Sequence, residues 1–356
     1  MNAASILYYP FNENIRRVNN LEKSLVRILP KFYPFAGRYI KENQLVDCGD
    51  QGAEFVEAQV DCKLHEIIGS DVDLNDLLPV EVGAADDVTD PIMSIQINKF
   101  KCGGVAIATS ISHRIADAAT LDIFLSAWAK ASQNLGTPDY GIMRTRNPTV
   151  VTKRILFDSM AIATLRHRVS HLYENRERPA SRVQLVTSFL TEALSRSDRA
   201  KHGKPRGCFV IQVVNIRERT VPPLSKYSCG NLMTLATLER SADETKSTDF
   251  EHYVPLLDNT VKKTVSDCAE ILLTGKDGHK ILFENLARVA AKAGDSTINS
   301  MQFTDLSKFG FYEVDFGFGK PIWTTIANVP MKNLILLLNT KENDGMKFGC
   351  ICMRTT

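Results

Sequence analysis

The chain has 356 residues, which is enough for two domains that each bury a core. Hydrophobic residues make up 44% of it and charged residues 24%, as in an ordinary globular protein, and a formal net charge of +2 gives no electrostatic footprint for nucleic acid. We therefore expect no nucleic-acid partner. No apolar run is long enough to cross a bilayer, so we expect no membrane partner either.

The first part of the chain mixes helical and strand-like patterns. Apolar residues at Leu21, Leu25 and Ile28 predict a helix over residues 19–29. The turn residues Lys101-Cys-Gly-Gly104 separate two strand-like segments and predict a hairpin. Apolar residues at Leu121, Phe124, Leu125 and Trp128 predict a helix, and we interpret that apolar face as core packing. The strands predicted here cover residues 44–47, 54–60, 91–98 and 105–112.

A segment without periodicity, residues 134–150, contains glycine and proline and is the best linker candidate. The expected organisation is an N-terminal domain over residues 1–137, a linker over 138–152 and a C-terminal domain over 153–356. Mixed helices and strands on both sides of the linker indicate an α/β protein. Beyond the linker, helices are predicted at 159–173, 182–196, 249–274 and 281–293, and strands at 153–157, 207–215, 231–239 and within 322–352.

The run Ser112-His-Arg-Ile-Ala-Asp-Ala118 lies where a predicted strand ends and a predicted helix begins. Such a corner can present His113 to a pocket, and a neutral imidazole can accept a proton from a hydroxyl near pH 7. Asp117 either shares a helical face with His113 or turns away and holds the loop. The motif alone is also compatible with a capped helix start beside a surface histidine.

A second motif, Asp315-Phe-Gly-Phe-Gly319, follows 198 residues after Asp117. Together with His-x-x-x-Asp it resembles the signature of the plant BAHD acyltransferases. Further segments resemble the family in the same order along the chain, so that the resemblance covers about residues 5–345. The segment around His113 resembles the branch that includes vinorine synthase and salutaridinol acetyltransferase. These further segments are Tyr33-Pro-Phe-Ala-Gly-Arg38, Val46-Asp-Cys-Gly-Asp-Gln-Gly52, Val214-Asn-Ile-Arg217, Pro222-Pro-Leu224 and Gly230-Asn231.

The resemblance implies two chloramphenicol-acetyltransferase-like α/β domains with a channel between them and His113 at its centre. It implies that His113 is the general base that activates an acceptor hydroxyl for attack on an acyl-CoA thioester. It also implies that Asp117 points away from His113 and pairs with Arg217, supporting the loop. The absence of a Gly-x-Ser-x-Gly sequence gives no indication of a covalent acyl-enzyme and favours direct transfer.

The glycine-rich motif is interpreted as structural. Gly317 and Gly319 permit backbone angles that other residues resist, and Asp315 completes the motif. Phe318 stands where the family usually has tryptophan, so the indole donor is lost while aromatic bulk is kept. Ser181-Arg182 resembles a family segment near the coenzyme phosphates, and an ordinary helix cap by Ser181 is an equal alternative.

The expected function is transfer of an acyl group, an acetyl group by resemblance to this branch, from acyl-CoA to a hydroxyl of a plant specialised metabolite such as an alkaloid. No permanently bound cofactor and no metal are expected, because the cysteines and histidines lack metal-site spacing. The eight scattered cysteines indicate reduced thiols, so we expect a cytoplasmic protein, and a monomer. Both ends look shorter than in the family. The alternatives are therefore an inactive, truncated paralogue that binds small molecules, and an acyltransferase for acylsugars or other alcohols.

Overall fold

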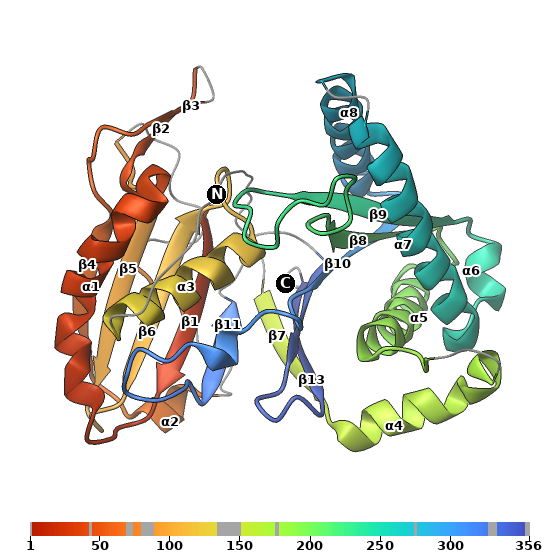
Figure 1. The fold of residues 1–356 in the computed structure, drawn as a ribbon. Coiled ribbons are helices and arrows are strands. Elements are labelled where there is room, and N and C mark those ends of the chain that lie inside the picture. Colours follow the sequence, from red (N-terminus) through yellow and green to blue (C-terminus); the bar gives the residue numbers. More distant parts are fainter. Residues whose placement is uncertain are drawn as a thin grey trace.

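The computed structural model describes residues 2–42, 45–68, 74–79, 89–133, 151–174, 178–273, 276–326 and 333–352. Within these ranges the chain forms two halves, each built on a β-sheet with helices packed against it (Figure 1). Both sheets contain parallel and antiparallel pairs. The expected α/β class with mixed sheets is therefore confirmed.

The first half is a five-stranded sheet in the order β11-β1-β6-β5-β4. Strands β5 and β6 form the predicted antiparallel hairpin, whereas β4 lies parallel to β5 at the edge. Helices α1 and α3 cover one face (Figure 1). A small two-stranded sheet, β2 with β3, and the short helix α2 complete this half. The bounds are β1 Asn2–Tyr9, α1 Leu21–Ile28, β2 Arg38–Ile40, β3 Leu45–Asp47, β4 Glu54–Val60, α2 Leu64–Ile67, β5 Met93–Phe100, β6 Val105–Ser112, α3 Ala118–Ser132 and β11 Trp323–Ile326.

The second half is a six-stranded sheet in the order β7-β13-β12-β10-β8-β9. One face packs on α4, α5 and α7, and α8 packs on the other face near β8 and β9. The bounds are β7 Val151–Phe157, α4 Ser159–Arg168, α5 Arg182–His202, β8 Cys208–Asn215, β9 Met233–Arg240, α6 Glu244–Ser247, α7 Phe250–Leu273, α8 Lys276–Ala293, β10 Asn299–Asp305, β12 Leu334–Asn339 and β13 Met346–Cys352. Five 3-10 turns lie at Ile15–Asn20, Leu29–Ala36, Asn75–Leu77, Ser170–Tyr173 and Phe311–Glu313.

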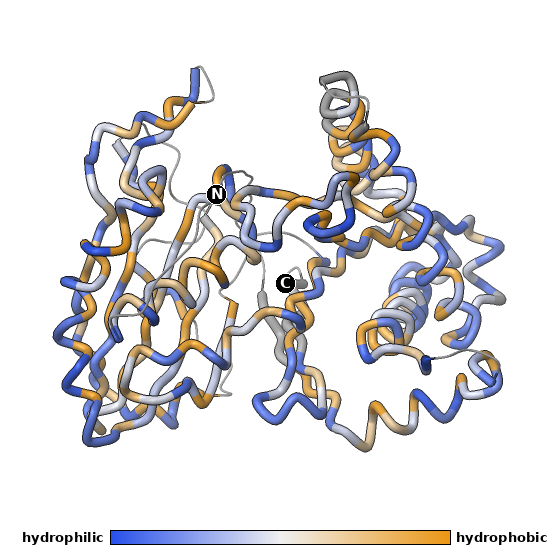
Figure 2. The backbone as a smooth tube through the Cα atoms, in the orientation of Figure 1, coloured by the Kyte–Doolittle hydropathy of each residue, from blue (hydrophilic) through white to orange (hydrophobic). Residues whose placement is uncertain are grey.

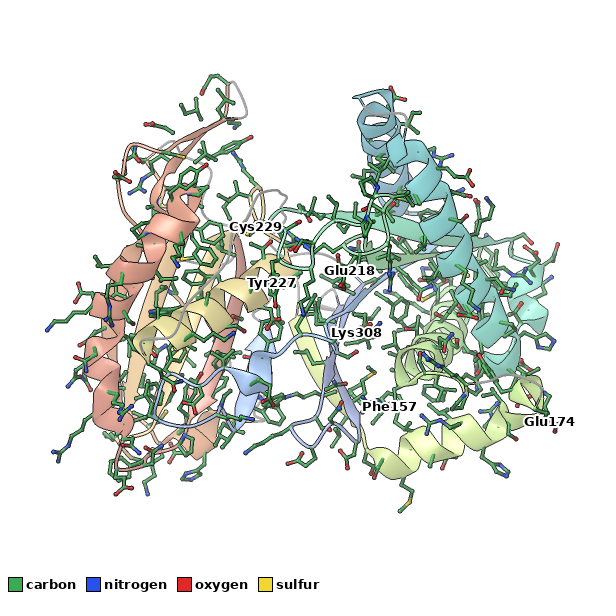
Figure 3. The ribbon with its side chains drawn as sticks, viewed as in Figure 1. Phe157, Glu174, Glu218, Tyr227, Cys229 and Lys308 are labelled. Atoms are coloured by element: carbon green, nitrogen blue, oxygen red, sulfur yellow. The ribbon has the colours of Figure 1, made fainter. Side chains whose placement is uncertain are left out.

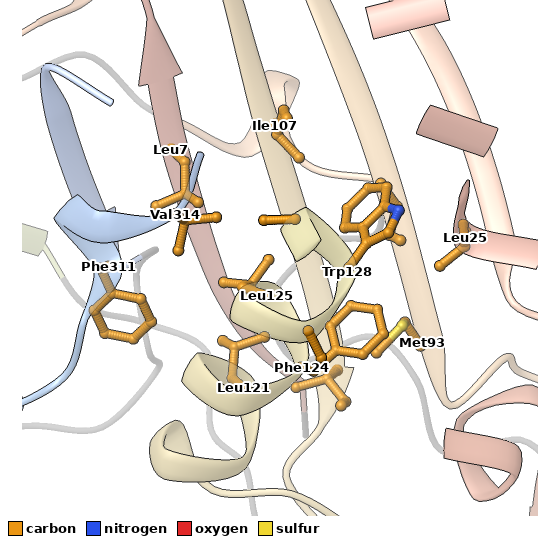
Figure 4. Close-up of a cluster of buried hydrophobic side chains, with 14 of the residues drawn as sticks. Leu7, Leu25, Met93, Ile107, Leu121, Phe124, Leu125, Trp128, Phe311 and Val314 are labelled. Atoms are coloured by element: carbon orange, nitrogen blue, oxygen red, sulfur yellow. The ribbon is translucent and has the colours of Figure 1, made fainter. Parts of the chain in front are cut away.

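The core of the first half is centred on α3. Its apolar face is buried between α1 and the sheet, where Trp128 and Phe124 stack at 6.0 Å between ring centroids (Figure 4). The Trp128 Nε1 donates a hydrogen bond to Ser24 Oγ (2.9 Å), so the buried indole N–H has a hydrogen-bond partner. The predicted apolar face of this helix is therefore core, as expected.

The two halves share part of this core. Phe311 and Val314, which follow β10 in the chain, pack beside Leu7 and α3 (Figure 4), and β11 pairs antiparallel with β1. Strand β11 thus belongs to the first sheet, and Phe311 and Val314 to its core, although they lie within the expected C-terminal domain, 153–356. The expected division needs this correction, because the exposed edge of β1 gains backbone partners only from β11. Of the expected linker, residues 138–150 lie outside the described residues, and 151–152 begin β7.

Most sequence-predicted elements match the structure within a few residues. Strand β4 has the predicted bounds, and α7 spans nearly the predicted range. Strands β1 and β10 were not expected. Hydrophobic and hydrophilic residues are mixed along the helices (Figure 2), and among the described residues no helix is long and apolar enough to cross a membrane.

Candidate active site

The strand that carries the first motif is β6, and all eight of its residues are buried. It pairs with β1 on one side and β5 on the other, which fixes its end in space. The chain leaves the sheet at Ser112, whose carbonyl accepts hydrogen bonds from the amides of Ile115 (2.9 Å) and Ala116 (3.2 Å). This tight turn places His113 at the predicted corner between β6 and α3.

His113 is half-buried at this corner. Burial disfavours the charged imidazolium and lowers the pKa of His113 below 6.5, although the nearby Asp117 carboxylate acts in the opposite direction. The imidazole is therefore neutral at pH 7. A neutral imidazole has one free lone pair and can accept a proton.

Asp117 is the N-cap of α3 and uses both of its carboxylate oxygens. The Oδ1 accepts the amide of Thr120 (2.9 Å) and one guanidinium N–H of Arg217 (3.1 Å). The Oδ2 accepts the other terminal nitrogen of Arg217 (2.8 Å) and the amide of Leu232 (3.1 Å). Four donors occupy the roughly four acceptor positions of a carboxylate, which leaves none over for an imidazole.

Arg217 is the partner that the resemblance to the family implied for Asp117. Its side chain is only 2% exposed and forms the two-pronged pair with the carboxylate. Of the remaining N–H groups, Nε donates to the carbonyl of Ser228 (2.7 Å), Nη2 to the carbonyl of Gly230 (2.8 Å) and Nη1 to the Asn215 Oδ1 (3.2 Å). A buried guanidinium with all these partners is rigid, so the position of Asp117 is fixed from the second half of the molecule.

The segment between β8 and β9, residues 216–232, joins the two halves at this point. Its Gly230 exchanges two hydrogen bonds with the Thr120 hydroxyl on α3, at 3.1 Å and 3.2 Å. Tyr227 and Cys229 lie on this segment between α3 and the second half (Figure 3). Sequence reasoning missed Thr120. Its position three residues after Asp117, where a helix cap residue accepts a backbone amide, could have pointed to Thr120.

The glycine-rich motif forms a tight loop around Asp315. The Asp315 Oδ1 accepts the amides of Gly317 (2.7 Å) and Gly319 (2.9 Å). Both glycines have positive φ values, +94° and +97°, a backbone conformation that favours glycine over residues with a side chain. Phe318 is 2% exposed and packs edge-on against Tyr9, with 5.0 Å between ring centroids.

This loop lies at the opposite end of α3 from His113. The carbonyl of Phe316 accepts a hydrogen bond from Ser132, the last residue of α3 (2.9 Å), and Gln133 donates to the carbonyl of Asp315. The 15 residues of α3 span roughly 22 Å at 1.5 Å per residue. The loop and the histidine are therefore not parts of one reacting cluster.

Ser181 and Arg182 lie at the start of α5. Ser181 caps the helix, accepting the amide of Gln184 (3.2 Å), while the Gln184 side chain accepts the amide of Ser181 (2.7 Å). Arg182 binds the turn before β13 through Asn343 Oδ1 (2.7 Å). Ser181 is thus an ordinary cap of α5, the alternative considered from the sequence. A contact of either residue with coenzyme remains a prediction.

Comparison with known proteins gives a consistent picture. The family model described as the transferase family matches residues 1–140 and 141–352. The chain is 35% identical to a pelargonidin 3-O-(6-caffeoylglucoside) 5-O-(6-O-malonylglucoside) 4'''-malonyltransferase of Salvia splendens, covering 97% of this chain and 85% of that protein. It is 33% identical to vinorine synthase of Rauvolfia serpentina, covering 96% and 84%. A shortening of both ends is not evident from these matches.

Solved structures resemble the fold over almost the whole chain. The crystal structure of vinorine synthase superposes with a TM-score of 0.79 at 30% identity, covering 99% of this chain and 87% of that one. The structure of F. sporotrichioides TRI101, a complex with coenzyme A and T-2, superposes with a TM-score of 0.74 at 15% identity, covering 99% and 91%. The second likeness concerns the fold alone.

Proposed function

The chain belongs to the BAHD transferase family of acyltransferases, and from that premise we propose that it transfers an acyl group from acyl-CoA to a hydroxyl of a plant specialised metabolite. The observation that carries the proposal is the position of His113, a neutral, half-buried imidazole at the end of β6. Asp117 is engaged by Arg217, so His113 acts as the base without a carboxylate relay.

The proposed reaction is a direct transfer. The His113 imidazole takes the proton of the acceptor hydroxyl while the hydroxyl oxygen attacks the thioester carbonyl carbon, and a tetrahedral oxyanion forms. The oxyanion collapses, the carbon–sulfur bond breaks, and the leaving thiolate takes the proton from the imidazolium. The products are the ester and free coenzyme A, and His113 returns to its neutral form.

The acyl group and the acceptor are proposed from the resemblance of the segment around His113. That resemblance supports an acetyl group and an alkaloid-like alcohol. The malonyl group named for the Salvia splendens relative is the competing donor. A difference of one small group in an apolar pocket changes preference by about 1–3 kcal/mol, so relatives of one fold can differ in donor. We propose coenzyme A contacts at Ser181 and Arg182, and a monomeric, cytoplasmic enzyme.

The test is release of free thiol from a panel of acyl-CoA donors, acetyl-CoA and malonyl-CoA included, with candidate alkaloid and anthocyanin alcohols. We expect ester formation that disappears in His113→Ala. Thiol release that persists in His113→Ala would remove the proposed base. Binding of acceptors without any turnover by the native chain would favour the non-catalytic alternative.

A further inference from the structure

Two cysteines that are 40 residues apart in sequence lie side by side at the far end of the first sheet. Parallel strands β4 and β5 pair Val60 with Phe100. One residue further on, the side chains of Asp61 and Lys101 form an ion pair at 2.7 Å, so the two segments still lie next to each other beyond the strands. Cys62 and Cys102 follow, and Cys102 lies in the turn that joins β5 to β6.

Backbone contacts hold these two residues in that arrangement. The amide of Lys101 donates to the carbonyl of Cys62 (3.2 Å), and the amide of Leu64 donates to the Cys102 sulfur (3.3 Å). Both contacts place the segments that carry Cys62 and Cys102 next to each other beside the turn between β5 and β6.

The surroundings make Cys102 the more reactive thiol. Cys102 is exposed and Cys62 is partly exposed. Partial burial works against the Cys102 thiolate, but the amides of Leu64, Gly104 and Cys102 itself, together with Lys63, outweigh it and lower the pKa of Cys102. Burial raises the pKa of Cys62, and nearby acidic groups and the Cys102 sulfur raise it further. One thiol is thus set up as the nucleophile and the other as its resolving partner.

We propose that Cys62 and Cys102 form an oxidisable thiol pair that a peroxide converts to an intramolecular disulfide, with Cys102 reacting first. The Cys102 thiolate attacks one oxygen of hydrogen peroxide, the O–O bond breaks, and hydroxide leaves as Cys102 becomes a sulfenic acid. The Cys62 sulfur then attacks the Cys102 sulfur, the S–O bond breaks and water leaves. In sum, two thiols and one hydrogen peroxide give one disulfide and two waters.

The pair lies far from the proposed reaction centre. Cys102 precedes the start of β6 and His113 follows its end, and the eight residues between Val105 and Ser112 span roughly 26 Å. A bond between Cys62 and Cys102 would join the edge strand β4 to the hairpin without touching His113. Oxidation is therefore expected to raise the melting temperature and to leave turnover unchanged.

The experiment is a peroxide titration of the full chain, followed by alkylation of remaining thiols, digestion without reductant, and mass spectrometry. We expect a cross-linked peptide containing Cys62 and Cys102 in the native chain. In Cys62→Ser, oxidation should stop at a sulfenic acid on Cys102, which dimedone traps. Cys102→Ser should give neither product.

Cys48 is the matched control, because it is an exposed thiol of the same half whose pKa is raised by burial and by Asp47 and Asp50. Cys48→Ser should form the cross-link as the native chain does, and Cys48 should alkylate more slowly than Cys102 at pH 7. The proposal fails if Cys48 oxidises before Cys102, or if the Cys102 sulfenic acid forms and no cross-link to Cys62 follows. Peptide mapping needs no catalytic activity, so this outcome is independent of the proposed acyl transfer.

Discussion

At the scale of single residues, the two members of the His-x-x-x-Asp motif have separate tasks. His113 is an imidazole whose pKa is lowered by burial and which can accept a proton, whereas the four acceptor positions of Asp117 are filled by N–H donors. A substitution of His113 should therefore reduce activity, whereas a substitution of Asp117 should reduce stability. Activity and stability, measured side by side, separate the two roles.

Asp117→Asn should lower stability. The amide that replaces one oxygen must point its own N–H groups at Arg217 or at a backbone amide, all of which are donors. Because the pair is almost fully buried, we expect a loss of about 3 kcal/mol in unfolding free energy, measured by denaturant titration. Asp158→Asn is the control, since exposed Asp158 caps α4 through the amide of Ala161 (2.7 Å) and asparagine caps equally well.

His113→Ala should reduce activity and leave stability unchanged. We expect turnover to fall by about 10²–10⁴-fold while the melting temperature stays near that of the native chain. If Asp117→Asn instead keeps its stability and loses only kcat, a catalytic dyad would replace the structural role assigned to Asp117.

The pH dependence of turnover should report on His113 directly. The base acts in its neutral form, so activity is lost as the pH falls through the pKa of the imidazole. Because burial lowers that pKa below 6.5, the acidic limb of kcat/KM should lie below the value for a free histidine. An acidic limb above 6.5 would show that the Asp117 charge, and not burial, dominates at this position.

At the scale of elements, the backbone angles of the Asp315–Gly319 loop should restrict which residues it tolerates. Gly317 and Gly319 have φ values of +94° and +97°, where an L side chain is strained. Alanine at either position should cost about 1–3 kcal/mol in unfolding free energy and leave kcat unchanged, because the loop lies far from His113. Gly49→Ala is the control. Its φ lies outside the positive range, and the nearest atom to the new Cβ is the flexible end of Gln51 (2.9 Å).

Local patterns were sufficient to predict many elements. The alternation in β5, the turn before β6 and the apolar face of α3 each depend on residues close in sequence, and all three were predicted correctly. Strand β10 has buried Asn299, Met301 and Phe303 at every second position, but its polar neighbours weaken the pattern. Pairing between distant strands was not predictable. The parallel pairing of β4 with β5, which brings the segments that carry Cys62 and Cys102 to the same end of the sheet, has no local signal.

In the candidate site, too, the features encoded by neighbouring residues were predictable and the contacts between distant segments were not. His113 and Asp117 lie within one short motif, so their placement at the corner was predictable from sequence. Arg217 was identified only through the resemblance to the family. The Thr120 contacts with Gly230 depend on how the segment 216–232 approaches α3, which only the folded chain determines.

At the scale of the whole molecule, the two halves are joined by more than the segment at Arg217. Strand β11 extends the first sheet, and Lys347 of β13 reaches from the second sheet to it. The Lys347 ammonium lies 3.7 Å from the ring centroid of Trp323 and 4.7 Å from that of Tyr312, and it donates to the carbonyl of Thr324 (3.3 Å). No acidic group pairs with Lys347 within 4.0 Å among the described residues.

This buried amine should make stability depend on pH. Burial lowers the pKa of Lys347 to about 7, and the charge of Glu342 offsets only part of that effect. Between about pH 7 and the ordinary value of 10.5, the unfolded chain holds a proton that the folded chain has released. Unfolding free energy should therefore rise with pH across this window, by at most about 1.4 kcal/mol per pH unit.

The two aromatic rings oppose this trend, because each favours the charged ammonium by about 1–2 kcal/mol. The slope of the unfolding free energy against pH shows whether burial or the two aromatic rings have the larger effect on the pKa of Lys347. The comparison is unfolding free energy against pH for the native chain and for Lys347→Met, which keeps an unbranched side chain, one atom shorter, without a titrating group. We expect the native chain to gain stability relative to Lys347→Met above pH 7. Parallel curves would mean that the rings keep Lys347 charged and that this junction between the sheets is held by a cation–π contact at every pH tested.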